Sequence, residues 1–202
     1  MHPTFYFVLA ALLAASAYAQ VVDIDGEILF MDDSFYVLPV IRGQGGGLTL
    51  RGRGGKPCPF DIVQSSSEVN EGIPVKFSGW TSRVGFVPDS ENLHIKTVVK
   101  ATICLQSTYW RIGEFDDVRK QYFVVAGPKP KSSEKDSLKS FFTIEKSGDD
   151  AFKFVFCPRD WDSDSPKCSD VGIFVDELGV RRLALSDTPF LVMFKKANVT
   201  EV

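Results

Sequence analysis

Residues 58–104 read CPFDIVQSSSEVNEGIPVKFSGWTSRVGFVPDSENLHIKTVVKATIC, with a cysteine at each end. Apolar and polar residues alternate in two runs near the middle, 73–77 and 93–99, as they do in half-buried β-strands. Between the runs lies Gly79–Gly85, GWTSRVG, which contains a single basic residue, Arg83. The pattern predicts two strands joined by a loop that presents Arg83, inside a ring that the two terminal cysteines close.

Short strand-like runs continue through the rest of the chain, and no long window has the apolar spacing of an amphipathic helix. About a dozen short strands predict an all-β sandwich or barrel. Weak likeness among units near 35–77, 93–125 and 141–194 favours a barrel of three pseudo-repeats, a β-trefoil. The other expected strands are 21–26, 35–39, 48–50, 60–63, 101–105, 108–112, 121–125, 141–145, 152–156, 172–175 and 190–194, and 129–137 is expected to be a polar surface loop.

The N-terminus has the pattern of a secretory signal peptide. Phe5–Ala15 is a short apolar run without charge, and Ala17-Tyr18-Ala19 is a small-x-small cleavage site, so we expect cleavage before Gln20. The run is too short to span a bilayer, which takes about 20 residues. The expected product is a secreted single domain, residues 20–202, with no membrane segment. Its tail carries the glycosylation sequon Asn198-Val199-Thr200.

An even number of cysteines in a secreted chain predicts disulfides. The four cysteines can pair in three ways, and we expect the sequential one, Cys58 with Cys104 and Cys157 with Cys168. A zinc site would need ligands in a recognisable spacing, but the chain has no C-x2-C pair, and one histidine, His94, follows the leader. We therefore expect no metal ion.

Signals of catalysis or of nucleic-acid binding are absent from the sequence. The net charge is -3 with both signs spread along the chain, which argues against a polyanion ligand. There is no G-x-S-x-G or HExxH motif, and a hydrolytic triad would have only His94 as its imidazole base. His94 alternates with apolar neighbours in a strand, so we expect it to face the surface. The chain is predicted to be neither an enzyme nor a cofactor protein.

The chain from residue 21 onward resembles the plant Kunitz-type (soybean trypsin inhibitor-like) family, and is most similar to its members from cruciferous plants. The resemblance lies in VVDIDG (21–26), FYVLP (35–39), CP (58–59), VQS (63–65), EGI (71–73), FVFCP (154–158), CSDVGI (168–173), RRL (181–183) and PFLVMF (189–194). It implies a β-trefoil, it agrees with the sequential disulfide pairing, and it implies protease inhibition in plant defence by a monomer.

The resemblance also assigns a reactive site. The family's reactive position falls on Arg83 as the P1 residue and Val84 as the P1′ residue, within a loop that includes Gly79, Trp80, Thr81, Ser82 and Gly85. A basic P1 residue implies a trypsin-like serine protease as the partner, because the specificity pocket of such a protease carries a carboxylate. The Arg83–Val84 bond would enter the protease cleft as a substrate does.

One position departs from the family pattern, and two other functions fit the same fold. Met31 stands where well-characterised inhibitors have an asparagine that supports the reactive loop from within. A papain-like cysteine protease, bound through another loop, is an alternative target. A non-inhibitory trefoil that binds a ligand or serves as a storage protein is the other alternative. The secretory route leads to the apoplast and also to the vacuole.

Overall fold

The computed structural model describes residues 20–80, 84–99, 103–104, 107–131, 135–158 and 168–198. In this part of the chain twelve strands form one antiparallel sheet system, and the one helical element is a short 3-10 helix, η1 (Lys135–Ser140). The strands are β1 (Phe35–Pro39), β2 (Leu48–Arg53), β3 (Lys56–Gln64), β4 (Val75–Gly79), β5 (Leu93–Thr97), β6 (Tyr109–Ile112), β7 (Val124–Gly127), β8 (Phe142–Lys146), β9 (Phe152–Phe156), β10 (Ser169–Val175), β11 (Arg181–Ser186) and β12 (Val192–Lys196).

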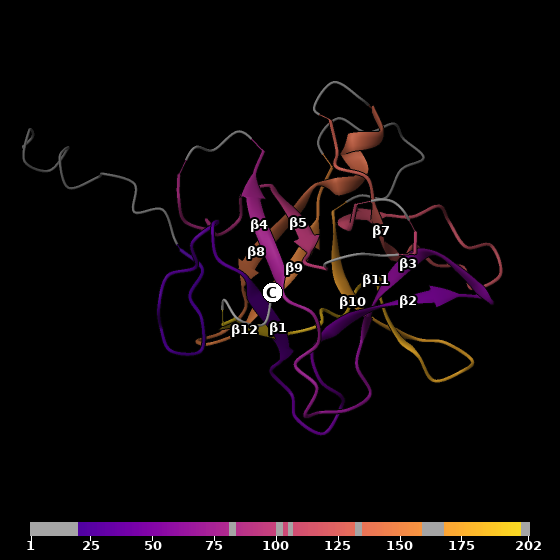
Figure 1. The fold of residues 1–202 in the computed structure, drawn as a ribbon, viewed down its shortest axis with the longest axis horizontal. Coiled ribbons are helices and arrows are strands. Elements are labelled where there is room, and N and C mark those ends of the chain that lie inside the picture. Colours follow the sequence, from indigo (N-terminus) through magenta and orange to yellow (C-terminus); the bar gives the residue numbers. More distant parts are fainter. Residues whose placement is uncertain are drawn as a thin grey trace, which may run out of the picture.

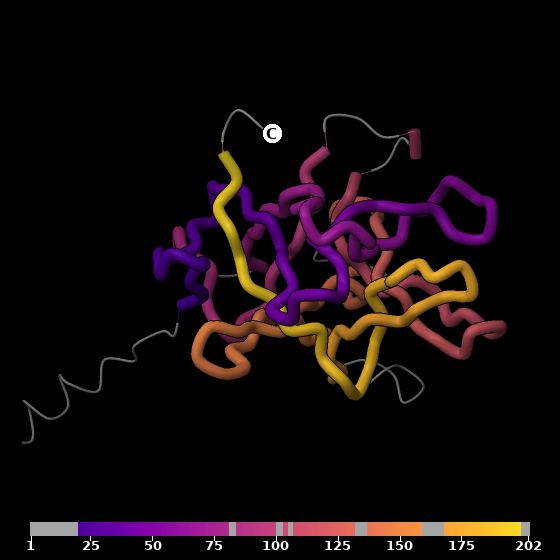
Figure 2. The backbone as a smooth tube through the Cα atoms, turned by 90° about the horizontal axis from the view of Figure 1, so that it is seen from below, coloured from indigo at the N-terminus to yellow at the C-terminus, as the bar shows by residue number. Residues whose placement is uncertain are grey.

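Six of the strands close into a barrel. β4 pairs with β5, β8 with β9, and β12 with β1, and these three pairs are joined through β1–β4, β5–β8 and β9–β12. The β1–β12 pair has five residues in register and brings the two ends of the chain together, with β12 running beside the first described segment (Figure 2). Closing the ring leaves none of these six strands as an exposed edge.

The other six strands form three hairpins at one end of the barrel. These are β2–β3, β6–β7 and β10–β11, and β3 pairs with both β7 and β11 (Figure 1). Four strands per unit, repeated as β1–β4, β5–β8 and β9–β12, give the β-trefoil expected from the sequence. The boundaries differ from expectation at one place, because 142–146 completes the second unit and does not begin the third.

The core is built from aromatic side chains that point into the barrel. Phe35 and Phe77 pack near Phe194, and Phe154 lies between Phe194 and Trp110. All five side chains are at most 2% exposed. Large rings at alternating strand positions explain the period of two in the sequence, since every second side chain of a barrel strand faces inward.

Both disulfides form in the sequential pairing, as predicted. Cys58 joins Cys104, and Cys157 joins Cys168, with Cα–Cα distances of 5.6 Å and 4.1 Å. The first bridge links β3 to the chain after β5, so the ring that it closes contains β4 and β5. A covalent ring of this size stabilises a fold by about 4 kcal/mol in the chain-entropy model.

Three sequence-based predictions of secondary structure were wrong. Residues 21–26 form isolated bridges and no strand, while 181–186 form a strand that the alternation did not reveal. Four consecutive positions of β11 are buried, including Arg182, so the apolar periodicity is lost. The expected loop at 129–137 ends in η1, where Ser137 is 5% exposed. The strand expected at 101–105 lies largely outside the described residues, and Ile103 and Cys104 form a turn.

A buried ionic network joins the three hairpins. The Arg182 guanidinium lies 2.7 Å from the carboxylates of both Asp61 and Asp176. Arg53 contacts Asp61 at 3.2 Å and Asp116 at 3.1 Å, so residues from all three hairpins take part. Burial raises the pKa of Asp61, because the two guanidinium groups only partly offset its removal from water. A network of this kind fixes geometry more than it adds stability.

We expect Arg182→Met to destabilise the protein strongly, because Asp61 and Asp176 would lose their buried partner. The expected loss is about 3–5 kcal/mol in the free energy of unfolding, measured by urea denaturation. Arg42→Met, at an exposed arginine in a turn, is the control and should change stability by less than about 0.5 kcal/mol. An Arg182→Met protein as stable as wild type would show that the network does not hold the hairpins together.

Candidate functional site

The candidate reactive loop connects β4 to β5 at the barrel end opposite the three hairpins. Of the predicted site residues, the structure describes Gly79, Trp80, Val84 and Gly85, while residues 81–83, and with them Arg83, lie outside the described part. The site is therefore described through its two flanks. The first flank is Gly79 and Trp80, before residues 81–83, and the second is Val84 to Val87, after them.

The first flank is held by the β4–β5 ladder. Ser78 is in register with His94, and Gly79 with Leu93, so β4 remains paired up to its last residue. Glycine at 79 therefore lies within a paired strand, where its backbone is fixed by the ladder. The chain enters the loop from a defined position.

Trp80, the next residue, is held between two rings. Its indole stacks on Phe141 with ring centroids 4.2 Å apart, and it meets His94 at a tilt of 38° with centroids 4.0 Å apart. His94 in turn meets the edge of Tyr109. Aromatic contacts of this kind contribute about 0.5–1.5 kcal/mol each beyond the area that they bury. Trp80 thus anchors the first flank to β5 and to the residue before β8.

His94 lies on the outer side of β5, as the sequence predicted, but neighbouring side chains cover it there and leave it half-buried. Burial beneath Trp80 lowers the pKa of His94 to about 4, and the positive charge of Lys129 acts in the same direction. Its Nδ1 atom is buried without a hydrogen-bond partner among the described residues, as is Nε1 of Trp80. The imidazole is therefore a neutral packing element at neutral pH. The strand alternation could not reveal this, because the covering ring comes from another part of the chain.

The second flank is braced by the N-terminal segment. The N–H of Met31 donates to the carbonyl of Gly85 at 2.9 Å, and the N–H of Val87 donates to the carbonyl of Leu29 at 2.8 Å. The N–H of Val21 donates to the carbonyl of Val87 at 3.1 Å. Val87 itself is fully buried, so this flank is attached by both backbone and side chain.

Met31 helps to hold the second flank in place. Its side chain is partly buried against the core, and its backbone supplies the hydrogen bond to Gly85. The support that it gives is thus a main-chain contact at the far flank. Neither the sequence nor its periodicity signalled this contact, because the bracing segment forms no regular strand.

A metal site and a membrane-spanning helix are both absent from the described part of the chain. It has no cluster of three or more His, Cys, Asp or Glu side chains placed to hold a metal ion, and no helix long and apolar enough to cross a membrane. Asn198 of the sequon is described and exposed.

Comparisons with known proteins agree on one family. A family model of the legume Kunitz type, described as trypsin and protease inhibitor, matches residues 21–196. Kunitz trypsin inhibitor 4 of Arabidopsis thaliana is 74% identical over 204 residues, covering 100% of this chain and 94% of the relative. Soybean trypsin inhibitor in complex with porcine pancreatic trypsin superposes with a TM-score of 0.73 at 30% identity, covering 89% of this chain and 99% of that one. The Kunitz-type cysteine protease inhibitor from potato gives 0.72 at 27% identity, covering 90% and 99%.

We expect Trp80→Ala to release the first flank. Loss of the stacked indole should lower the free energy of unfolding by about 2 kcal/mol, less than for a fully buried tryptophan, because Trp80 is half-buried. It should also increase the rate at which the chain is cut within residues 81–83, measured by limited proteolysis. Phe115→Ala removes an aromatic ring that is 41% exposed and lies away from this stack, and is the control. Equal cutting rates in both variants would exclude the anchoring role.

The depressed pKa of His94 predicts a pH dependence of stability. Between about pH 6.5 and 4 the unfolded chain binds a proton on His94 that the native protein does not, so the native state loses stability as the pH falls through this window. The measurement is the urea midpoint at pH 7 and at pH 4.5, in wild type and in His94→Phe, which keeps a stacking ring. The wild type should lose more stability than the variant on acidification. Equal losses would mean that His94 titrates normally.

Proposed function

The chain belongs to the Kunitz family of trypsin and protease inhibitors, and from this premise we propose that it is a secreted inhibitor of trypsin-like serine proteases. The family consists of protease inhibitors and not of enzymes. The observation that carries the proposal is the fixation of both flanks of residues 81–83, by the Trp80 stack on one side and the Met31–Gly85 hydrogen bond on the other.

Arg83 is the proposed P1 residue and Val84 the P1′ residue. The support is the resemblance to the family together with the short span between the anchored flanks, in which Arg83 is the single basic residue. An arginine suits a specificity pocket with a carboxylate at its base, since the planar guanidinium forms two parallel charge-assisted hydrogen bonds.

The proposed mechanism is substrate mimicry by a loop that loses little freedom on binding. A segment already held at both ends pays a small entropic cost when a protease cleft immobilises it, so the complex dissociates slowly. If the Arg83–Val84 peptide bond is hydrolysed, each new end stays attached to its flank, and Cys58–Cys104 also joins the two pieces covalently. The ends therefore stay in place for the bond to be re-formed.

A cysteine protease is the second candidate target. The observation that favours it is the superposition on the potato cysteine protease inhibitor over nearly the whole chain. Such a target would use a different surface, and inhibition of papain would then survive substitution of Arg83. A panel of trypsin and papain separates the two proposals.

The route to the target is also part of the proposal. We infer secretion from the leader at residues 1–19, with delivery to the apoplast or to the vacuole. Asn198 is exposed at the end of the described chain, which suits attachment of a glycan at the sequon. The protein would act as a monomer, presenting one loop to one protease.

We expect Arg83→Ala to abolish trypsin inhibition and Arg83→Lys to retain most of it. The purified protein, lacking residues 1–19, is titrated against active trypsin, and the wild type should inhibit it at a ratio of one to one. Loss of the P1 side chain removes the charge pair in the specificity pocket, so the inhibition constant should rise at least about a hundredfold.

Arg42→Ala is the matched control, because Arg42 is an exposed arginine in a turn outside the loop. Its inhibition constant should equal that of wild type. Undiminished inhibition by Arg83→Ala would locate the reactive site elsewhere. Failure of the wild type against trypsin together with inhibition of papain would favour the second candidate.

A further inference from the structure

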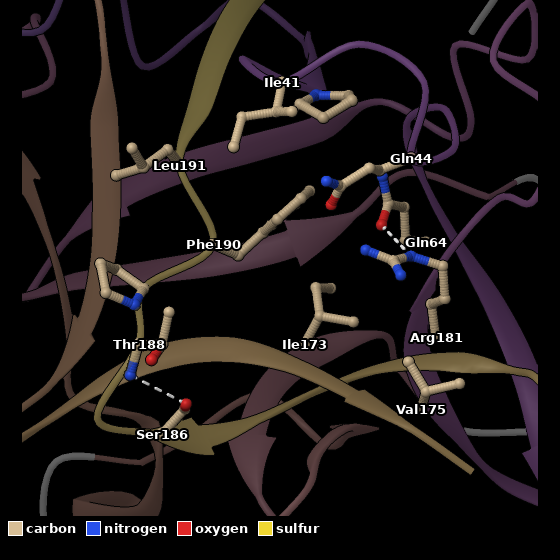
Figure 3. Close-up of a pocket in the computed structure, with 12 residues that line it drawn as sticks. Ile41, Gln44, Gln64, Ile173, Val175, Arg181, Ser186, Thr188, Phe190 and Leu191 are labelled. Atoms are coloured by element: carbon tan, nitrogen blue, oxygen red, sulfur yellow. Dashed lines mark hydrogen bonds between the residues drawn. The ribbon is translucent and has the colours of Figure 1, made fainter.

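A half-open apolar pocket of about 480 Å³ lies between the chain after β1, the hairpin β10–β11 and the connection from β11 to β12. Ile41, Ile173, Phe190 and Leu191 surround it in Figure 3, and Val175 lies at its rim. Ile41 and Val175 are 55% and 53% exposed, so the pocket opens to solvent between apolar side chains. The volume is in the range of sites that hold small organic ligands.

One side of the pocket is polar and positively charged. Arg181 is the one charged residue among the described residues that line it. Its Nε donates to Oε1 of Gln64 at 2.7 Å, which orients the guanidinium so that its terminal nitrogens face the space beside Phe190 and Ile173 (Figure 3). An arginine held in place by a buried acceptor is ready to bind an anion, because its orientation is already fixed.

Gln64 supplies a second donor at the same place. The residue is 3% exposed, and its Nε2 is buried without a hydrogen-bond partner among the described residues. Buried amide donors in proteins are nearly always hydrogen-bonded, so this one is available to an acceptor. The exposed side chain of Gln44 extends over this edge in Figure 3, so a ligand that reaches Nε2 would have to displace it.

The pocket lies at the opposite end of the barrel from the candidate reactive loop. β1 and β4 are antiparallel and meet at Phe35 and Val75. From there β1 runs to Pro39 at the pocket, while β4 runs in the opposite direction to Gly79 at the loop (Figure 1). A ligand in the pocket would therefore leave the loop free.

We propose that this pocket binds a small amphiphilic carboxylic acid, with an aromatic or branched aliphatic body among the apolar side chains and its carboxylate on Arg181. The carboxylate accepts from the terminal guanidinium nitrogens and from Nε2 of Gln64, which then has a partner. A cation is excluded by the positive charge of Arg181. A neutral apolar molecule would leave both donors unpaired in a partly dry site.

The test uses 2-naphthoate as the probe and 2-naphthamide as its neutral analogue. Binding to the purified protein lacking residues 1–19 is measured by calorimetry and located by amide shifts in ¹H–¹⁵N spectra. The naphthoate should saturate a single site, shift Ile173 and Phe190, and bind about tenfold more tightly than the amide, as expected for one charge-assisted contact. Equal affinity for the two probes, shifts confined to other regions or a lack of saturation would overturn the proposal.

Two variants test the charged contact of Arg181 and the apolar lining at Ile41 separately. Arg181→Gln removes the charge, and Ile41→Asp places a carboxylate at the exposed rim, so each should weaken naphthoate binding about tenfold or more. Leu178→Asp, the same change of charge at a residue that is 81% exposed and does not line the pocket, should bind as wild type does. Unchanged affinity in Ile41→Asp would overturn the proposal even if Arg181→Gln does not fold.

Trypsin titration in saturating naphthoate should give the stoichiometry found without it, so the outcome at the pocket is independent of the inhibitory function.

Discussion

The pairing of β1 with β12 is the constraint on which the rest of this structure depends. It joins strands from the two ends of the chain over five residues and turns an open sheet into a closed barrel. The aromatic core requires that closure, because Phe194 of β12 packs edge-on against both Phe77 and Phe154. Phe77 belongs to the first repeat, and Phe154 and Phe194 belong to the third, so opening the β1–β12 ladder would expose core surface from both of these repeats.

The two ends of the barrel are stabilised by different physical means. At the hairpin end, the charges buried around Arg182 fix how the three hairpins meet. Removing these charges from water costs free energy, and the resulting ion pairs determine one specific geometry. At the loop end the contacts that hold the two flanks are aromatic ring contacts and main-chain hydrogen bonds. The apolar pocket lies at the opposite end of the barrel.

Much of the architecture could be predicted from the sequence, because barrel strands alternate between core and solvent. The even number of cysteines and their order favoured the two bridges that are found, and the likeness among three units, together with the family resemblance, predicted the trefoil. β11 could not be found in this way, since its buried positions include the charged Arg182, whose partners Asp61 and Asp176 are supplied by β3 and by the chain after β10. The cover over the outward-facing His94 could not be predicted for a similar reason, because Trp80, which supplies it, lies on the far side of the loop. Contacts between distant segments decide such cases, and a local pattern does not contain them. The assignment of Arg83 rests on the family alone.

The threefold arrangement explains where the brace of the loop comes from. Each repeat places one connection at the loop end of the barrel: the long β4–β5 loop, the tight β8–β9 turn at 147–151, and a third position between β12 and β1. At the third position no turn joins the strands, because β1 and β12 are the first and last strands of the described chain. The incoming segment that contains Val21 and Met31 is consequently free to cross the end of the barrel and pair with residues beyond the loop. A circular permutant that starts at 147–151 would join β12 to β1 through a covalent turn. The segment that contains Val21 and Met31 would then no longer be free to cross the end of the barrel. The positions of the first and last described strands are thus part of what allows the β4–β5 loop to be long and still well supported.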